Sequence, residues 1–357
     1  MLALTSTAVS GELLTALERH RGWTVRQVPA VGAAAAALSA QERAQVRALV
    51  VETEPVDGAT MGGLANLEVV ICPRSEPVNV DLPAADRLAV AVVHAPGRNA
   101  EAVADFTLGL CLAAVRNIAI GHHGIVSGAL TSADGSRSGQ IAEGDVIWRP
   151  RDPGAVVPYL AYKGRELSSL AVGIIGYGAV GKAVARRFAG LVRQVIVTDP
   201  LVPAGSAAPG LVMMSLPDML PRADVVTLHA RSSSVVLGRR ELFMMKEGSY
   251  LINTARGSAL DYDALLGAID RGPLRGAALD VFPEEPLPYA SPLRTHPKLT
   301  LTPHLAGATE EVSGRQYTIA AGGLDGIYAQ ADGWEQLPVR NPGVRERWLR
   351  RRGAAGG

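Results

Sequence analysis

Short apolar runs alternate with helical segments along most of the chain, and this pattern indicates an α/β fold. Five strands are predicted in the first part of the chain, at residues 2–6, 23–28, 47–51, 67–71 and 88–93, and the last three are short apolar runs. Five more follow at residues 170–175, 194–198, 224–229, 250–254 and 276–281. Short runs that are apolar throughout are typical of parallel strands buried on both faces. The pattern therefore predicts parallel sheets, with residues 1–95 forming a small α/β unit of their own.

Two longer helical patterns are expected to connect the units. Apolar positions at helical spacing run from Gly97 to about Ile120, and Glu310 to Ala331 is the last segment with the pattern of an ordered helix. Residues 121–165 are rich in Gly, Ser, Asp and Pro, which leaves open whether this segment is an arm or a lid. Proline, arginine and glycine dominate from Gly333 onward, so a frayed tail is expected at 341–357.

The stretch 170–200 predicts a strand, a glycine turn, a helix and a second strand. The first apolar run stops at the G-x-G-x-x-G sequence Gly176-Tyr177-Gly178-Ala179-Val180-Gly181. Gly176 would supply the tight turn, Gly178 would let a pyrophosphate approach the backbone, and Gly181 would let the helix lie close to the strand. The strand, turn and helix in register predict a dinucleotide-binding unit.

The residues that follow these glycines indicate which dinucleotide is bound. The backbone amides of Ala179, Val180 and the next residues would face the phosphates from the start of the helix. The second strand ends at Asp199. A carboxylate there can accept both ribose hydroxyls of NAD and would repel the 2′-phosphate of NADP. NAD is therefore the expected cofactor.

Composition narrows the class of protein further. With 357 residues the chain is long enough for two domains, and a net charge of +1 gives no reason to expect nucleic acid or a membrane as partner. No apolar run approaches a membrane span, and the N-terminus lacks the pattern of a signal peptide. Cys72 and Cys111 alone predict no disulfide framework and no metal site. A cytoplasmic protein is expected.

Candidate catalytic residues follow the late apolar runs. Arg256 comes directly after one run, acids at 280, 284 and 285 follow the next, and His304 stands after a third short segment. The carboxyl ends of parallel strands meet at one edge of a sheet, where ligands bind. An Arg that anchors a carboxylate, a His that carries a proton and an acid that orients this His are what hydride transfer at a hydroxyl carbon requires.

At these residues the chain resembles the D-isomer-specific 2-hydroxyacid dehydrogenase family, especially its phosphoglycerate dehydrogenase-like members. The resemblance runs from about Val70 to Ala331. The segments that carry it are APGRNAEAVAD at 95–105, GYGAVG at 176–181, ADVVTLHA at 223–230, LINTARG at 251–257, GAALDVFPEEP at 276–286 and LTPHLAG at 301–307.

The resemblance implies a role for each matching residue. Arg256 would bind the carboxylate and the carbonyl oxygen of the substrate, and His304 would exchange the proton. Glu285, the acid immediately before the proline, would pair with His304 and favour its charged form. Asp280 would hold the nicotinamide carboxamide. Further contacts to the cofactor would come from Thr107, His229, Thr254 and Gly307.

The family also implies an architecture of two doubly wound parallel-sheet domains with an active-site cleft between them. A flavodoxin-like substrate domain would comprise 1–112 and 309–340, around a Rossmann NAD-binding domain at 113–308. Closure of such a cleft over the substrate would follow.

One loop departs from the family pattern. The family commonly has glycines before its N-x-D-L motif, whereas this chain has Arg74, Ser75 and Glu76. We expect Arg74, Ser75 and Asn99 to contact the substrate. Arg74, with Arg98, would recognise a second anionic group such as a phosphate or phosphonate; the alternative is that Arg74 and Glu76 simply pair with each other.

The predicted function is interconversion of a small D-2-hydroxy acid and its 2-keto acid with NAD. Two alternatives remain open, an NAD(H)-sensing protein similar to corepressors of this fold and a dehydrogenase of another anion such as phosphite or formate. A homodimer is expected, because the 121–165 segment has many apolar residues and the family dimerises there. These residues are Ile147, Trp148, Val156, Val157, Tyr159, Leu160 and Tyr162.

Overall fold

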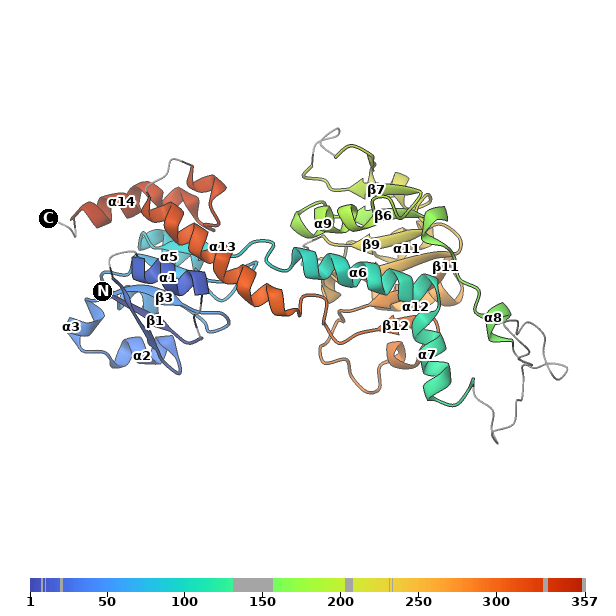
Figure 1. The fold of residues 1–357 in the computed structure, drawn as a ribbon, viewed down its shortest axis with the longest axis horizontal. Coiled ribbons are helices and arrows are strands. Elements are labelled where there is room, and N and C mark those ends of the chain that lie inside the picture. Colours follow the sequence, from blue (N-terminus) through green and yellow to red (C-terminus); the bar gives the residue numbers. More distant parts are fainter. Residues whose placement is uncertain are drawn as a thin grey trace. The chain divides into compact units, whose positions relative to one another are not determined.

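The computed structural model describes residues 1–354 except 8, 10, 20–21, 131–156, 203–207, 231, 233 and 330–332. The chain divides into two compact units, the first made of residues 1–99 and 309–357 and the second of residues 100–308 (Figure 1). Each unit contains one parallel sheet with helices packed on it. The predicted fold class, two parallel-sheet α/β domains, is confirmed.

The first unit has a five-stranded sheet in the order β2-β1-β3-β4-β5, with every neighbouring pair parallel. The strands are β1 (Leu2–Thr5), β2 (Thr24–Gln27), β3 (Val46–Val50), β4 (Val69–Cys72) and β5 (Ala91–His94). The helices are α1 (Gly11–Arg19), α2 (Val31–Ala37), α3 (Ala40–Arg43), α4 (Gly58–Gly62), α5 (Leu82–Arg87), α13 (Glu310–Tyr328) and α14 (Arg345–Ala354). α13 lies beside α1 and completes the core on that face of the sheet (Figure 1).

The second unit has a seven-stranded parallel sheet in the order β12-β11-β10-β9-β6-β7-β8. The strands are β6 (Ala171–Ile175), β7 (Gln194–Thr198), β8 (Leu211–Met213), β9 (Val225–Leu228), β10 (Ser249–Asn253), β11 (Leu274–Leu279) and β12 (Leu299–Leu301). The helices are α6 (Ala100–Val115), α7 (Ile118–Val126), α8 (Pro158–Ala161), α9 (Ala179–Phe188), α10 (Leu216–Met219), α11 (Arg239–Met244) and α12 (Tyr262–Asp270). Chain order reverses beside β6, so the glycine turn lies at the switch point of the sheet.

Helix α6 belongs entirely to the second unit. Its buried residues Ala104 and Cys111 share a core with Val184 and Phe188 of α9. The structural boundary therefore falls between 99 and 100, whereas the sequence predicts it after residue 112. The helical pattern expected at 97–120 also ends earlier, because Asn117 adopts a left-handed conformation (φ 57°) between α6 and α7.

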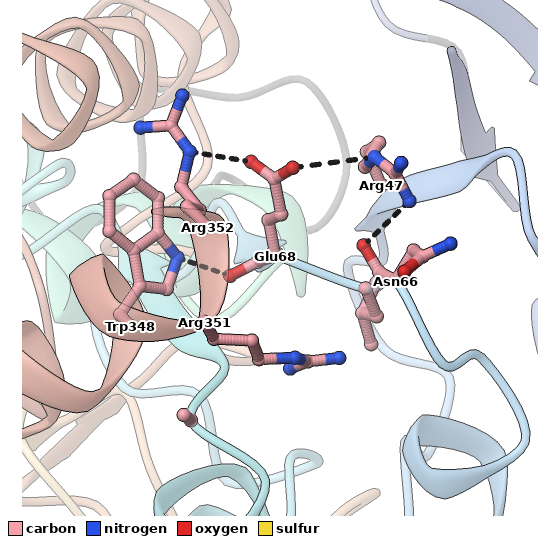
Figure 2. A pocket seen from close by; sticks show the side chains of 8 residues that line it. Arg47, Asn66, Glu68, Trp348, Arg351 and Arg352 are labelled. Carbon is pink, nitrogen blue, oxygen red and sulfur yellow. Dashed lines mark hydrogen bonds and ion pairs between the residues drawn. The ribbon is translucent and has the colours of Figure 1, made fainter. Parts of the chain in front are cut away.

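The frayed tail expected at 341–357 is wrong for residues 345–354, which form α14. Trp348 is 1% exposed, and its indole N–H donates to the backbone oxygen of Glu68 at 2.9 Å. The Glu68 carboxylate forms ion pairs at 3.3 Å with Arg47 and with Arg352, and Figure 2 shows both cations pointing toward it. Arg352 also lies over the Trp348 ring. The prediction of a tail rested on the arginine-rich composition of this segment and did not take the buried Trp348 into account.

Neither a membrane span nor a metal cluster is found in the part of the chain that the structure describes. Within the described residues, no single helix is long and apolar enough to span a membrane; α6 and α7 reach that length and hydropathy only together, across a bend of 68°. The same residues contain no cluster of three or more His, Cys, Asp or Glu side chains suited to a metal ion.

Candidate active site

The glycine turn after β6 has one packed side and one open side. Gly176 has φ +93°, and a Cβ there would lie 2.7 Å from the backbone nitrogen of Ala230. A Cβ on Gly181 would lie 2.0 Å from the Gly176 oxygen, so any larger residue would push α9 away from the strand. A Cβ on Gly178, in contrast, would have no atom within 4 Å. The turn thus offers an open backbone surface at the N-terminus of α9, which begins at Ala179 and Val180.

Asp199 follows β7 and is held by backbone donors. The N–H of Tyr177, inside the glycine turn, donates to Oδ2 at 2.7 Å, and the N–H of Leu201 donates to Oδ1 at 2.9 Å. The carboxylate is therefore fixed beside the turn and keeps lone pairs for further donors. This is the position that the sequence predicted for ribose recognition.

The other predicted cofactor residues differ in how accessible they are. Thr107 is completely buried, and its hydroxyl lies 3.1 Å from that of Thr254 and donates to Val103 O at 2.7 Å. Its hydroxyl therefore helps to position that of Thr254. A direct contact of Thr107 with the cofactor stays a prediction. His229 is 9% exposed, its Nε2 lies 2.8 Å from the Thr227 hydroxyl, and its Nδ1 has no partner among the described residues. Burial lowers the pKa of His229 to about 3, so it is neutral.

These features fit a dinucleotide. An open glycine backbone, a fixed carboxylate and the unsatisfied buried Nδ1 of His229 provide the donors and acceptors that such a cofactor uses. When bound, the nicotinamide would supply or accept the hydride. Gly307, also predicted to line the cofactor, follows the buried Ala306 at the end of the His304 loop.

Arg256 lies on a turn after β10 that other residues shape. The Asn253 side chain donates to Arg256 O at 3.0 Å and accepts from Ala255 N at 3.0 Å. A Cβ on Gly257 would lie 1.9 Å from Phe282 O, so only glycine lets this turn pack on the loop that carries Glu285. Arg256 is exposed and, within the described residues, forms no ion pair. It is therefore available to bind an anion.

Glu285 and His304 form the pair that the sequence predicted. Oε2 of Glu285 lies 2.6 Å from Nδ1 of His304, and Oε1 accepts from Phe282 N at 2.9 Å. Burial tends to raise the pKa of Glu285, but the contact with His304, the Phe282 N–H and the charge of Arg256 together lower it. The ionised carboxylate thus orients the ring from Nδ1, and the predicted proton transfer would use Nε2.

Asp280 holds the His304 loop in place. It is completely buried, and its carboxylate accepts from the Thr302 hydroxyl at 2.6 Å and from the N–H groups of Leu305 and Ala306 at 2.9 and 2.8 Å. Its backbone oxygen accepts from His304 N at 2.8 Å, which holds His304 in a left-handed conformation with φ 56°. The predicted contact of Asp280 with the nicotinamide stays a prediction.

Glu285 and His304 form part of the wall of a pocket of about 530 Å³ in the second unit. Most of the wall is apolar, and Arg294 adds a cation. The lining residues are Phe282, Glu285, Pro286, Leu287, Arg294, Leu301, Thr302, Pro303 and His304.

The predicted substrate residues of the first unit lie together on two loops. Arg74 and Ser75 follow β4, Asn99 follows β5, and the Ser75 hydroxyl lies 3.4 Å from the Asn99 side-chain oxygen. Glu76 forms an ion pair with Arg340 at 3.3 Å, so its carboxylate is engaged by a residue from the C-terminal segment. The alternative in which Arg74 and Glu76 pair only with each other therefore loses support.

Sequence reasoning missed the residues that shape the loops. The motifs assign no role to Asn253, Gly257 or the Phe282 N–H, yet these groups shape the turn of Arg256 and hold Glu285. The resemblance assigns Asp280 to the cofactor, whereas its contacts in the structure organise the His304 loop. The one available signal was the identity of residue 257, because a glycine directly after a predicted catalytic Arg indicates close backbone approach.

The fold and these residues define a dinucleotide-dependent oxidoreductase, and comparison with known proteins identifies the family. Residues 151–306 match the model of the D-isomer specific 2-hydroxyacid dehydrogenase, NAD binding domain. Glyoxylate reductase of Thermofilum pendens is 32% identical over 277 residues, which is 76% of this chain and 75% of that protein. The chain belongs to the D-isomer-specific 2-hydroxyacid dehydrogenase family, as the sequence predicted, and is an oxidoreductase with an NAD(P)-binding domain.

Two further similarities extend this result. D-3-phosphoglycerate dehydrogenase of Mycobacterium leprae is 33% identical over 76% of this chain but only 47% of its own length, so the chain spans about half of that relative. The crystal structure of TT0316 protein from Thermus thermophilus superposes with a TM-score of 0.69 at 29% identity, covering 93% of this chain and 98% of that one.

The contact between Glu285 and His304 generates a pH prediction. We expect Glu285→Gln to make protonation of His304 less favourable, because the glutamine keeps a hydrogen-bonding group but removes the charge. Reduction of a 2-keto acid needs protonated His304, so its high-pH limit should move to lower pH. Oxidation needs neutral His304 and should begin at lower pH than in the parent. Rate profiles in both directions test this.

Glu284→Gln is the matched control, since Glu284 is the neighbouring acid and should leave both profiles in place. If Glu285→Gln leaves the pH profiles of reduction and oxidation unchanged, the contact between Glu285 and His304 does not control proton transfer.

Proposed function

We propose that this protein is an NAD-dependent dehydrogenase that interconverts a small D-2-hydroxy acid and its 2-keto acid. The observation that carries the proposal is the 2.6 Å contact between Glu285 and His304, with Arg256 close enough to stabilise the charge of Glu285. An anion-binding cation and an oriented proton carrier are the two groups that carbonyl reduction requires from the protein.

In the direction of reduction, Arg256 would bind the substrate carboxylate through two parallel hydrogen bonds and polarise the carbonyl oxygen. As the carbonyl carbon gains a hydride, its oxygen becomes basic and takes the proton from Nε2 of His304. Glu285 would stabilise the imidazolium before transfer and hold the ring afterwards. In the direction of oxidation His304 would start neutral and accept the hydroxyl proton.

Consumption of NADH with a panel of 2-keto acids, plain, dicarboxylic and phosphorylated, tests the function. We expect turnover in the wild type and a loss of about a hundred- to ten-thousandfold in kcat for His304→Ala, the usual contribution of a positioned proton carrier. NADH binding, followed by fluorescence, should survive this substitution. His296→Ala is the control, because His296 contacts Asp270 at 3.2 Å, away from the pair.

Two other outcomes of the substrate panel would each support one of the alternative functions. Tight NADH binding without turnover of any 2-keto acid would support a sensing protein instead. Reduction of NAD by phosphite or formate, with no response to hydroxy acids, would support a dehydrogenase of another anion.

The cofactor preferred is NAD and not NADP, because the fixed carboxylate of Asp199 would repel a 2′-phosphate. We expect kcat/KM to be about a hundredfold higher with NADH than with NADPH, because like-charge repulsion of this kind costs on the order of a few kcal/mol. Asp199→Ala should narrow this preference. Comparable efficiencies of the wild type with NADH and NADPH would refute the assignment.

We also propose that the protein is a two-fold symmetric homodimer. Three apolar residues on α7 are exposed, Ile118 at 57%, Ile125 at 57% and Val126 at 71%. An apolar helix face of this kind is typical of an interface between copies. In the 121–165 segment Leu160 is also exposed, at 48%, whereas Val157 is buried and Ile147, Trp148 and Val156 lie outside the described residues.

Light scattering at micromolar concentration should give the mass of a dimer for the wild type. Ile125→Lys should shift the mass toward a monomer, while Val235→Lys, at another exposed apolar residue of the second unit (54% exposed), should not. A monomeric wild type would overturn the proposal.

A further inference from the structure

A buried carboxylate collects three cations at the amino edge of the seven-stranded sheet, where the amino ends of its strands lie. Asp224, which directly precedes β9, is 1% exposed. Its Oδ1 accepts from Arg165 and from Lys246, each at 2.8 Å, and its Oδ2 lies 3.6 Å from Nη2 of Arg193. Ala171 N also donates to Oδ2, at 2.8 Å. Since the strands are parallel, this cluster lies at the opposite edge of the sheet from the glycine turn.

The cations of this cluster outnumber its acids. Burial tends to raise the pKa of Asp224, but the Ala171 N–H and the two cations on Oδ1 lower it to about 2, so this carboxylate is ionised. Three cations face one carboxylate, which leaves two positive charges in excess. Glu166 and Glu247, the neighbouring acids in sequence, are exposed and form no ion pair within the described residues. The cluster therefore keeps a net positive charge.

The three cationic side chains also have N–H groups to spare. Arg165 and Lys246 each donate one hydrogen bond, to Asp224, and Arg193 donates from Nε to Ser169 O at 3.4 Å. A guanidinium and an ammonium both carry more N–H donors than these contacts use. The side chain of Arg165 is 32% exposed, that of Lys246 39% and that of Arg193 53%. Several donors on three convergent groups are thus open to an acceptor from solvent.

A buried hydroxyl at the same edge lacks a partner. Tyr250 is 4% exposed, and its hydroxyl makes no hydrogen bond in the part of the chain that the structure describes. The Tyr250 N–H donates to Asp224 O at 3.0 Å, which fixes this residue beside the cluster. Burial raises the pKa of Tyr250, whereas the charges of Arg275 and Arg165 lower it, so both guanidinium groups act on the hydroxyl. Because buried hydroxyl groups normally have a partner, an unpaired one beside cations favours a ligand that accepts from it.

We propose that Arg165, Arg193 and Lys246 form a binding site for a phosphate group, with the Tyr250 hydroxyl as a neutral donor. The two excess charges match the charge of a phosphate group near neutral pH, about −1.5 to −2. Guanidinium groups bind phosphate oxygens through parallel hydrogen bonds. Free phosphate and the phosphate of an organic ester share this chemistry. The site lies within the second unit alone, and it does not depend on the dehydrogenase reaction.

Isothermal titration calorimetry with inorganic phosphate tests the site on the full chain saturated with NADH. The bound NADH occupies the glycine turn, so the added phosphate reports on other sites. We expect one phosphate per chain in the wild type. Arg193→Gln should weaken binding by about tenfold, the usual effect of losing a hydrogen bond to a charged group. Absence of saturable binding to the wild type would overturn the proposal.

Arg222→Gln is the matched control for the loss of one positive charge. Arg222 is exposed, stands two residues before Asp224 and makes no side-chain contact within the described residues. Its replacement should leave the phosphate affinity near the wild-type value. Equal losses of affinity in Arg193→Gln and Arg222→Gln would mean that net charge alone attracts the anion, and the site would be refuted.

Tyr250→Phe separates ligand binding from a structural role. The substitution removes a hydroxyl without a partner in the described protein, so the melting temperature without phosphate should not fall, while the phosphate affinity should. If the cations serve only to hold the elements around Asp224 together, Arg193→Gln and Tyr250→Phe would both leave the phosphate affinity unchanged, which contradicts the proposal.

A parallel titration with glycerol 3-phosphate distinguishes the two sources of the phosphate group. Tighter binding of this ester than of inorganic phosphate would identify a phosphate ester as the ligand. Tighter binding of inorganic phosphate would identify the free anion. In either case Arg193→Gln should weaken the preferred ligand, and an unchanged affinity would count against the site.

Discussion

The geometry of the active site depends on the buried carboxylate of Asp280. It lies at the end of β11, where its N–H donates to Asn253 O at 2.9 Å, and its side chain collects donors from the loop that carries His304. The turn of Arg256 and the loop of His304 are thus built on one residue. A buried carboxylate that accepts this many hydrogen bonds is satisfied, whereas an apolar substitute would leave several backbone N–H groups unsatisfied.

The arginines of the two units differ in whether they have an acidic partner. Arg352 and Arg47 both pair with the acid Glu68. Arg256 and Arg74, in contrast, form no ion pair among the described residues. A guanidinium that is partly buried without an anionic partner costs free energy, and such positions are enriched at functional sites.

Local pattern predicted the elements well where strands are buried and helices are amphipathic, as at β6, α9 and β7. It missed β8 and β12, each only three residues long, because pairing at a sheet edge and not local hydrophobicity defines them. Glu285 and His304 were found through their motifs. The supporting roles of Gly257 and Asn253 were not, since they depend on contacts between loops distant in sequence. The anchoring of Trp348 likewise depends on Glu68, far away in the chain.

The anchoring of α13 and α14 on the first unit fixes the order in which the protein can fold during synthesis. The core beneath α1 contains Leu13 and Leu17 together with Leu324, Trp334 and Trp348. These apolar surfaces cannot meet until the ribosome has passed the whole second unit, residues 100–308. The inserted unit can therefore complete its own core first, while the segment made earliest waits longest with an exposed apolar face, which makes it the part of the nascent chain most dependent on protection from aggregation.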